Sequence, residues 1–108
     1  QELLVDFLRT NIKVTSLQDI QFHVSKYFNI NFSDLCSKSR SRFISRPRQI
    51  AMYLSKELTE FSCPDIGKLF GGKDHTTVIH AVNKIKNLSL IDKKIKKDIE
   101  NLTLTLKS

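Results

Sequence analysis

The side chains best suited to recognition chemistry in this sequence stand together in one short stretch. Asp74, His75 and Thr76 follow the glycine pair Gly71 and Gly72, with a single lysine between the two groups. Their carboxylate, imidazole and hydroxyl groups offer hydrogen-bond donors and acceptors. No carboxylate pair or cysteine–histidine spacing in the chain suggests catalysis. The chemistry on offer is therefore hydrogen bonding to the polar edges of another molecule.

A tight turn followed by a helix must position these groups. Glycine adopts positive φ without steric cost, so the pair at 71–72 allows the chain to reverse sharply. Asp74 then occupies the position of a helix N-cap, with Thr76 and Thr77 in the first turn. A helix is predicted from about residue 74 to residue 88, and its apolar side chains fall on one stripe at about 100° per residue. That stripe is Val78, Ala81, Val82, Ile85 and Leu88. The opposite, hydrated face holds Thr76, His80, Asn83, Lys84 and Asn87.

Each polar residue at the start of this helix also has a plain structural interpretation. Asp74 can cap the helix instead of contacting a partner, and Thr76 and Thr77 can simply be tolerated in a first turn. His80 lies at the edge of the polar face, where a structural hydrogen bond is favoured over a contact with a ligand. Only its position distinguishes His75 from an ordinary exposed histidine.

A shorter helix is predicted just before the glycine turn. Ser62, Pro64 and Asp65 mark its start, and Ile66, Leu69 and Phe70 form its apolar side. A short helix, a glycine turn and a polar-faced helix make a helix-turn-helix pattern. The N-terminus of the second helix carries partial positive charge and free N–H groups that suit a phosphate. Side chains of its first turn can reach base edges in the major groove of DNA.

A basic segment lies upstream of this pair of helices. Residues 38–42 read Lys-Ser-Arg-Ser-Arg and are predicted to form an exposed loop. Four of the five arginines lie between Arg40 and Arg48, and no acidic residue occurs from Cys36 to Lys56. The formal net charge of the 108 residues is +7. Such basicity indicates a polyanionic partner, either nucleic acid or an anionic membrane surface.

The remaining chain predicts further amphipathic helices and no strand. A helix is expected over residues 1–13, another begins at Ser16 with Asp19 as its capping partner, and the longest begins at Ser45 and Pro47. A last helix is expected after Ser89. Core-facing stripes are predicted at Leu17, Ile20, Val24 and Phe28, at Ala51, Leu54, Leu58 and Phe61, and at Ile91, Ile95, Ile99, Leu102 and Leu106. The fold class is therefore all-α, with about five to six helices.

Two motifs resemble a known family. Residues 71–81 read GGKDHTTVIHA and residues 46–54 read RPRQIAMYL. Together these two motifs resemble the C-terminal DNA-binding domain of DnaA, the bacterial replication initiator. The resemblance covers about residues 14–108 and implies a helix-turn-helix domain of the TrpR-like type. Residues 1–13 would then be a connector helix from a preceding ATPase lid. The chain departs from the family at Lys73, where arginine is usual, and at Ser39 and Ser45.

The resemblance implies a function and assigns roles to particular residues. The expected function is binding of DnaA boxes in double-stranded DNA at the replication origin, for initiation and regulation of replication. By matching positions, Asp74, His75 and Thr76 would read base edges in the major groove, and Arg40 would enter the adjacent minor groove. The residues expected to hold phosphates are Arg48, Gln49, Lys56, Lys73, Thr77 and Lys84.

The same resemblance sets expectations for cofactors and location. ATP and Mg²⁺ are expected only in the full-length parent, with no cofactor and no enzyme activity in this fragment, and self-assembly is expected only through domains missing here. Gly71 and Gly72 lack the rest of a phosphate-binding loop. Cys36 and Cys63 suit neither a disulfide framework nor a zinc site. The chain does not begin with methionine, so a piece of a longer cytoplasmic protein of the bacterial nucleoid is expected.

Two other functions stay open. A transcriptional regulator could use the same helix-turn-helix on another operator, with a dimer and a palindromic footprint as its signs. A surface module could bind acidic phospholipids through the basic stretch. An absence of exposed aromatic side chains beside the basic loop is expected, and it argues against membrane binding as the main role.

Overall fold

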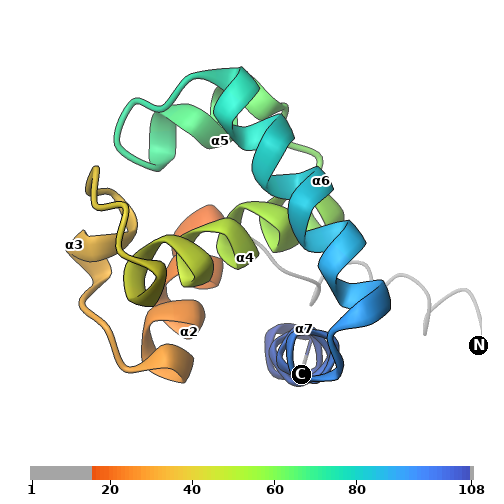
Figure 1. The fold of residues 1–108 in the computed structure, drawn as a ribbon. Helices are drawn as coiled ribbons and strands as arrows, with labels where there is room; N and C mark the ends of the chain where they lie inside the picture. The colour runs from red at the N-terminus through yellow and green to blue at the C-terminus, as the bar shows by residue number, and fades with distance from the viewer. Residues whose placement is uncertain (1–15, 108) are drawn as a thin grey trace, which may run out of the picture.

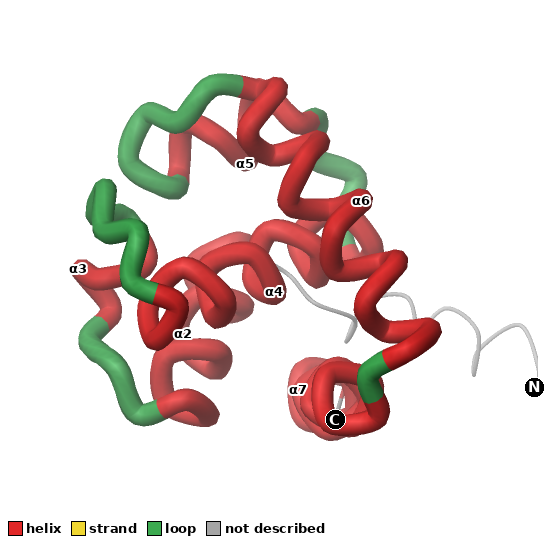
Figure 2. The backbone as a smooth tube through the Cα atoms, in the orientation of Figure 1, coloured by secondary structure: helices red, strands yellow, loops and turns green. Residues whose placement is uncertain are grey.

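The computed structural model describes residues 16–107, and all regular structure within that range is helical (Figures 1 and 2). The helices are α2 (Leu17–Phe28), α3 (Phe32–Leu35), α4 (Arg42–Leu58), α5 (Cys63–Leu69), α6 (His75–Ile91) and α7 (Lys93–Lys107). The predicted all-α class is confirmed. The helix expected over residues 1–13 and the domain boundary at residue 14 lie outside the described residues.

Helix α4 is the centre of the fold, because it contacts each of the other described helices (Figure 1). Its apolar face is buried at Ile50, Ala51 and Leu54. The stripe of α6 packs on this face, with Val78 and Ile85 fully buried. The remaining buried apolar residues are Leu17, Ile20, Val24, Leu35, Met52, Ile66, Phe70, Ala81, Ile95, Leu102 and Leu106. The polar face of α6 is thereby turned away from the core.

The helix starts that depend on local hydrogen bonds are confirmed. The Ser16 hydroxyl accepts from the Asp19 N–H at 3.1 Å, and the Ser62 hydroxyl accepts from the Asp65 N–H at 3.3 Å. Asn29 closes α2 in the left-handed region at φ 58°, a conformation that asparagine tolerates better than most residues.

The predicted start of α4 at Ser45 and Pro47 is wrong by about one turn. The helix begins at Arg42, because the Ser41 carbonyl already accepts from the N–H groups of Ile44 and Ser45 at 2.9 and 2.7 Å. Pro47 lies inside the helix, where it cannot donate to the carbonyl four residues back. Pro47 itself is buried, whereas Phe43, whose carbonyl lacks that donor, is exposed. Arg42 therefore belongs to the helix and not to the loop.

The early start of α4 also exposes an aromatic side chain. Phe43 is 68% exposed beside Arg42, so the expected absence of exposed aromatics next to the basic loop is wrong. It lines a hollow of about 340 Å³ whose other apolar residues are Phe28, Pro47, Ile50 and Ile95. The charged residues of the lining are Arg42, Arg46, Lys94 and Asp98.

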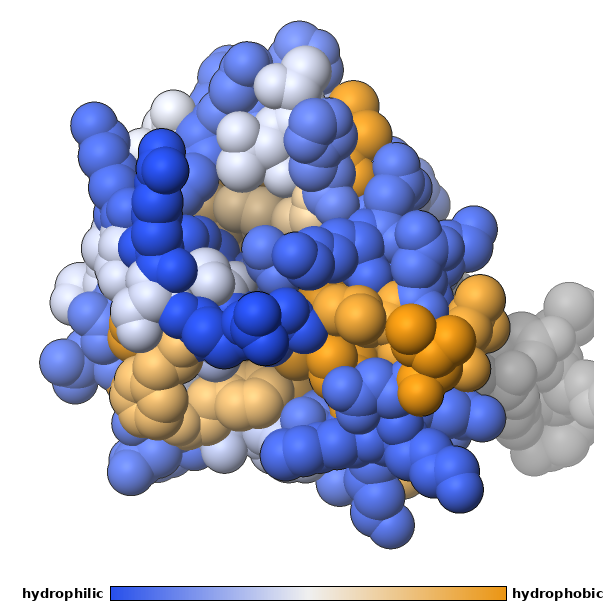
Figure 3. All heavy atoms as spheres, in the orientation of Figure 1, coloured by the Kyte–Doolittle hydropathy of each residue, from blue (hydrophilic) through white to orange (hydrophobic). Residues whose placement is uncertain are grey.

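Two residues assigned to the core lie at the surface. Phe61 is 39% exposed because α4 ends at Leu58. Ile91 is 79% exposed because α6 continues to it and stops at Asp92. The Asp92 carboxylate accepts from the N–H groups of Lys94 and Ile95 at 2.9 and 3.3 Å, so the break between the last two helices is three residues later than Ser89. Figure 3 shows the resulting hydrophobic patch where α6 meets α7.

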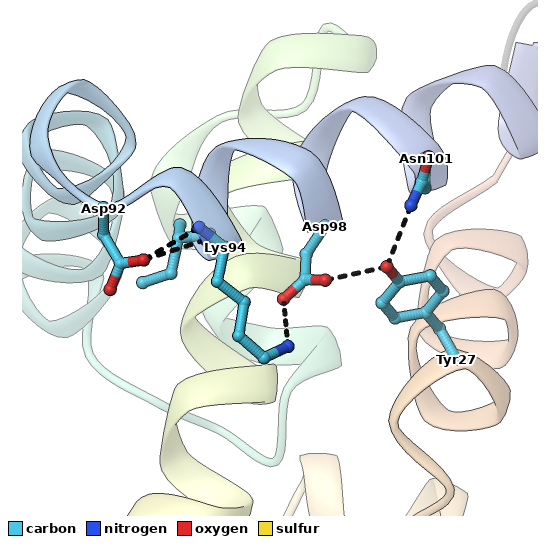
Figure 4. A network of polar contacts seen from close by, with 6 residues as sticks. Tyr27, Asp92, Lys94, Asp98 and Asn101 are labelled. Atoms are coloured by element: carbon cyan, nitrogen blue, oxygen red, sulfur yellow. Dashed lines mark hydrogen bonds and ion pairs between the residues drawn. The ribbon is translucent and has the colours of Figure 1, made fainter.

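A polar network fastens α7 to α2 (Figure 4). The Tyr27 hydroxyl donates to Asp98 Oδ1 at 2.7 Å, and Asn101 Nδ2 donates to the same hydroxyl at 3.2 Å. Lys94 Nζ completes the network at 3.3 Å from Asp98 Oδ2. Asp98 is only 6% exposed, and burial is the main cause that raises the pKa of Tyr27.

Removing the hydroxyl of this network is expected to destabilise the domain. Tyr27→Phe should lower the free energy of unfolding by about 1–2 kcal/mol, because a buried carboxylate loses a hydrogen-bond donor. Urea unfolding followed by circular dichroism measures the change. Tyr53→Phe is the matched control, since Tyr53 is half-buried without a side-chain hydrogen bond to residues 16–107. Equal losses for the two variants would contradict a stabilising role for the network.

Candidate nucleic-acid interface

The turn between α5 and α6 is a close crossing of two backbone segments. Gly71 and Gly72 have φ of 89° and 75°, which confirms the predicted glycine turn. The Lys73 N–H donates to the Gly67 carbonyl at 2.8 Å. A Cβ on Gly67 would lie 2.1 Å from the Lys73 carbonyl oxygen, so no side chain fits there. The turn holds the start of α6 against α5.

The first turn of α6 presents its polar side chains to solvent. Asp74 is the N-cap by position, and its carbonyl accepts from the N–H groups of Thr77 and Val78. Its carboxylate makes no side-chain cap. Instead Asp74 Oδ2 accepts from the Thr76 hydroxyl at 2.9 Å, and Oδ1 lies 3.3 Å from His75 Nδ1. The Thr76 hydrogen bond, with help from His75, holds the pKa of the Asp74 carboxyl below its ordinary value.

This arrangement groups the three predicted base-reading residues on one exposed edge. Asp74, His75 and Thr76 are all exposed, as is Thr77. The Thr76 hydroxyl is engaged with Asp74, so the threonine methyl is the group left to face a partner. The negative charge of Asp74 is fixed next to the imidazole of His75. At this edge the protein can therefore accept a hydrogen bond from a base through Asp74, offer a methyl group through Thr76 and make an imidazole contact through His75.

The predicted phosphate residues of α4 and α6 meet across a hollow of about 400 Å³. Its polar lining comprises Arg48, Gln49, Thr77, His80 and Lys84. Gln49 Oε1 is buried and accepts no hydrogen bond from residues 16–107. Lys56 follows Met52 of the same lining by four residues, which places it on the same face of α4. Figure 3 shows hydrophilic residues bordering a depression on the face below the turn that joins α5 and α6.

The structural hydrogen bond that the sequence predicts for His80 is not present in the part of the chain that the structure describes. The His80 imidazole forms no hydrogen bond with any residue of the described range. It lines the hollow instead and is exposed. Its place beside Thr77 and Lys84 adds it to the candidate interface. The signal for this was present in the sequence, because His80 and Lys84 are four residues apart and share a helix face.

The basic loop reaches the same side of the molecule through direct contact with the turn. Arg40 is exposed at its tip. Arg48 Nη1 and Nη2 donate to the carbonyls of Ser37 and Ser39 at 3.1 and 2.6 Å. Lys73 Nζ donates to the Phe70 carbonyl at 2.8 Å and lies 3.4 Å from that of Cys36. The sequence does not predict these contacts.

Burial shifts the acidity of both cations. It lowers the pKa of the Arg48 guanidinium. Burial, followed by the charge of Arg48, lowers the pKa of the Lys73 ammonium. Neither cation is therefore a freely hydrated surface charge.

Within residues 16–107 no three histidine, cysteine, aspartate or glutamate side chains are arranged to hold a metal ion. Gly71 of the glycine turn is packed against the Cys36 carbonyl. No helix in the same range is long and apolar enough to cross a membrane.

The described geometry agrees with a comparison against known families. A family model described as the bacterial DnaA protein helix-turn-helix matches residues 17–85. The match spans more than half of the chain and includes the basic loop, α4, α5 and the first part of α6. It confirms the resemblance inferred from the two motifs. The chain belongs to the family of bacterial DnaA helix-turn-helix domains, which bind DNA in the initiation of replication.

Proposed function

We propose that this domain binds the DnaA box of double-stranded origin DNA through two grooves at once. The observation that carries the proposal is the contact between the basic loop and the glycine turn, with Gly71 against the Cys36 carbonyl. This contact joins the start of the loop that carries Arg40 to the turn that precedes α6, which supports the use of both elements on one DNA site. A protein that reads adjacent grooves needs this arrangement of two reading elements.

In the major groove, the first turn of α6 is the reading element. The Asp74 carboxylate suits a cytosine amino group, since it is ionised and acts only as an acceptor. The Thr76 methyl suits a thymine methyl, because its hydroxyl is already bonded to Asp74. His75 adds a second polar side chain next to Asp74.

In the minor groove, Arg40 is the reading element. A·T-rich DNA has a narrow minor groove with a strong negative potential, which attracts an inserted arginine. Phosphates on either side would be held by the hollow between α4 and α6 and by Lys56. The N-terminus of α6 adds N–H groups and partial positive charge.

A titration tests the proposal directly. The domain is added to a fluorescent duplex that carries TTATNCACA and to a scrambled duplex, at two salt concentrations. We expect the box to bind on the order of 10²-fold tighter or more, as a few base contacts worth 1–3 kcal/mol each would give. Equal affinity for the two duplexes would refute sequence-specific binding. A dimeric complex on a palindrome, with no binding to a lone box, would favour the transcriptional regulator instead.

We also propose a second candidate function, binding to acidic phospholipid, which Phe43 favours. This side chain is 68% exposed between Arg42 and Arg46 at the edge of an apolar hollow. An exposed aromatic ring flanked by cations is the combination that anchors proteins at an anionic membrane surface.

Vesicle co-sedimentation checks this candidate. The domain should sediment with phosphatidylglycerol vesicles and stay in solution with phosphatidylcholine vesicles. Phe43→Ser should reduce binding about tenfold, since burying a phenylalanine side chain contributes about 1.5–3 kcal/mol. Phe61→Ser is the matched control, because Phe61 is exposed near Glu57 and Glu60 instead of arginines. No sedimentation of the wild-type domain would exclude the candidate.

A further inference from the structure

The loop that carries Arg40 and the turn that opens α6 are packed together, although more than 30 residues separate them. The contact depends on the absence of a side chain at Gly71, where a Cβ would lie 2.3 Å from the Cys36 carbonyl oxygen. Cys36 Sγ also lies 3.6 Å from the Leu69 carbonyl. The backbone at the start of the loop therefore rests on the backbone of the turn.

Two cations also hold the backbone at the start of the loop. Lys73, in the turn, bridges the Phe70 and Cys36 carbonyls with its ammonium group. Arg48, on α4, holds the carbonyls of Ser37 and Ser39 with its two Nη atoms. Three of the four residues before Arg40 thus have their carbonyl oxygens held by a positive charge.

The chemistry of these contacts differs from that of a phosphate contact. A lysine or arginine that serves only phosphates directs its donors away from the protein. Here Lys73 and Arg48 each donate two hydrogen bonds to protein carbonyls, and burial lowers the pKa of both side chains. Hydrogen bonds with a charged partner are stronger than neutral ones, so both side chains contribute to the position of the loop.

We propose that Lys73 and Arg48, with Gly71, are positioning residues that fix the distance between the Arg40 loop and the N-terminus of α6. The inference rests on the proposed two-groove recognition and revises the roles of both cations from phosphate contacts to supports of the loop. It has a consequence for DNA. One base pair inserted between the two contacted regions moves them about 3.4 Å apart and rotates them by roughly 35°, and a fixed loop cannot follow.

The glycine pair offers a charge-neutral test with a built-in control. Both residues have positive φ, but a Cβ on Gly71 collides with the loop while a Cβ on Gly72 meets no atom within 4 Å. Gly71→Ala should raise the dissociation constant for the box about tenfold, the loss of one good arginine contact. It should also reduce the discrimination against the duplex with the inserted base pair. Gly72→Ala shares the backbone strain and should keep the discrimination.

The cation itself is tested by a conservative pair. Lys73→Met should act like Gly71→Ala, and Lys73→Arg should restore discrimination because a guanidinium can reach the same carbonyls. Lys56→Ala serves as the phosphate control. It should weaken both duplexes alike and reduce the slope of log K against log salt by about 0.9.

A measurement without DNA separates this inference from the proposed function. Backbone ¹⁵N order parameters of residues 37–41 should be about 0.85 in the wild-type domain and fall below about 0.6 in Lys73→Met and Gly71→Ala. Unchanged order parameters in both variants would overturn the proposal, as would a slope reduced by about 0.9 in Lys73→Met with discrimination intact. If Gly71→Ala fails to fold, Lys73→Met decides alone. A wild-type domain that binds box and scrambled DNA equally would refute the proposed function, while the order parameters still decide whether the loop is held.

Discussion

Gly67→Ala is expected to destabilise the domain by about 3 kcal/mol or more, as overpacking of a rigid site does. The added methyl carbon would lie 2.1 Å from the Lys73 carbonyl oxygen. That atom belongs to the backbone, and the same two residues are joined by the hydrogen bond from the Lys73 N–H to the Gly67 carbonyl. Neither α5 nor the start of α6 can therefore yield without opening the turn.

The expected loss of stability is opposite in sign to the usual effect of replacing glycine by alanine in a helix. Gly67 lies inside α5, and alanine normally stabilises a helix interior by roughly 0.5–1 kcal/mol relative to glycine. Urea unfolding of the variant and the wild-type domain measures the difference. Gly67 does not share the positive φ of Gly71 and Gly72, so the collision with the Lys73 carbonyl is the expected cause of the loss. A Gly67→Ala variant as stable as the wild type would show that the two segments separate easily.

His75→Ala is expected to weaken binding to the box by about 1–3 kcal/mol and to leave binding to scrambled DNA nearly unchanged. The side chain is exposed at the N-terminus of α6 and is oriented by Asp74 Oδ1 at 3.3 Å from its Nδ1. Its loss would remove the proposed base contact, while alanine keeps the helix intact and Asp74 stays bonded to the Thr76 hydroxyl.

Lys56→Ala is the comparison that distinguishes a base contact from a phosphate contact. Paired titrations of both duplexes give the ratio of specific to non-specific affinity for each variant. His75→Ala should reduce the ratio, and Lys56→Ala should leave the ratio unchanged while both affinities fall. An equal loss on the two duplexes for His75→Ala would mean that the imidazole holds the backbone and reads no base.

Features set by neighbouring residues were predictable from the sequence. The caps at Ser16 and Ser62 depend on a hydroxyl and an N–H three residues away, and both hydrogen bonds form. The glycine turn and the buried stripe of α6 follow from backbone freedom and helical phase. For the same reason the positions of Asp74 and Thr76 at the start of α6 could be foreseen.

Features set by distant parts of the chain were not predictable. Pro47 indicates a helix start, but α4 begins a turn earlier, and the proline lies buried inside the helix. The contacts of Lys73 and Arg48 have carbonyl oxygens as acceptors, and every residue carries one. No residue type marks such an acceptor, so the sequence does not predict these contacts.

The support of the basic loop uses main-chain atoms of Cys36, Ser37 and Ser39. The side chain of Arg40 takes no part in it. Residue 40 can therefore be exchanged, by natural variation or by a mutant library, without loss of the contacts that hold the loop. In the proposed two-groove recognition, a change at residue 40 would therefore alter the minor-groove preference while the contacts that hold the loop stay the same.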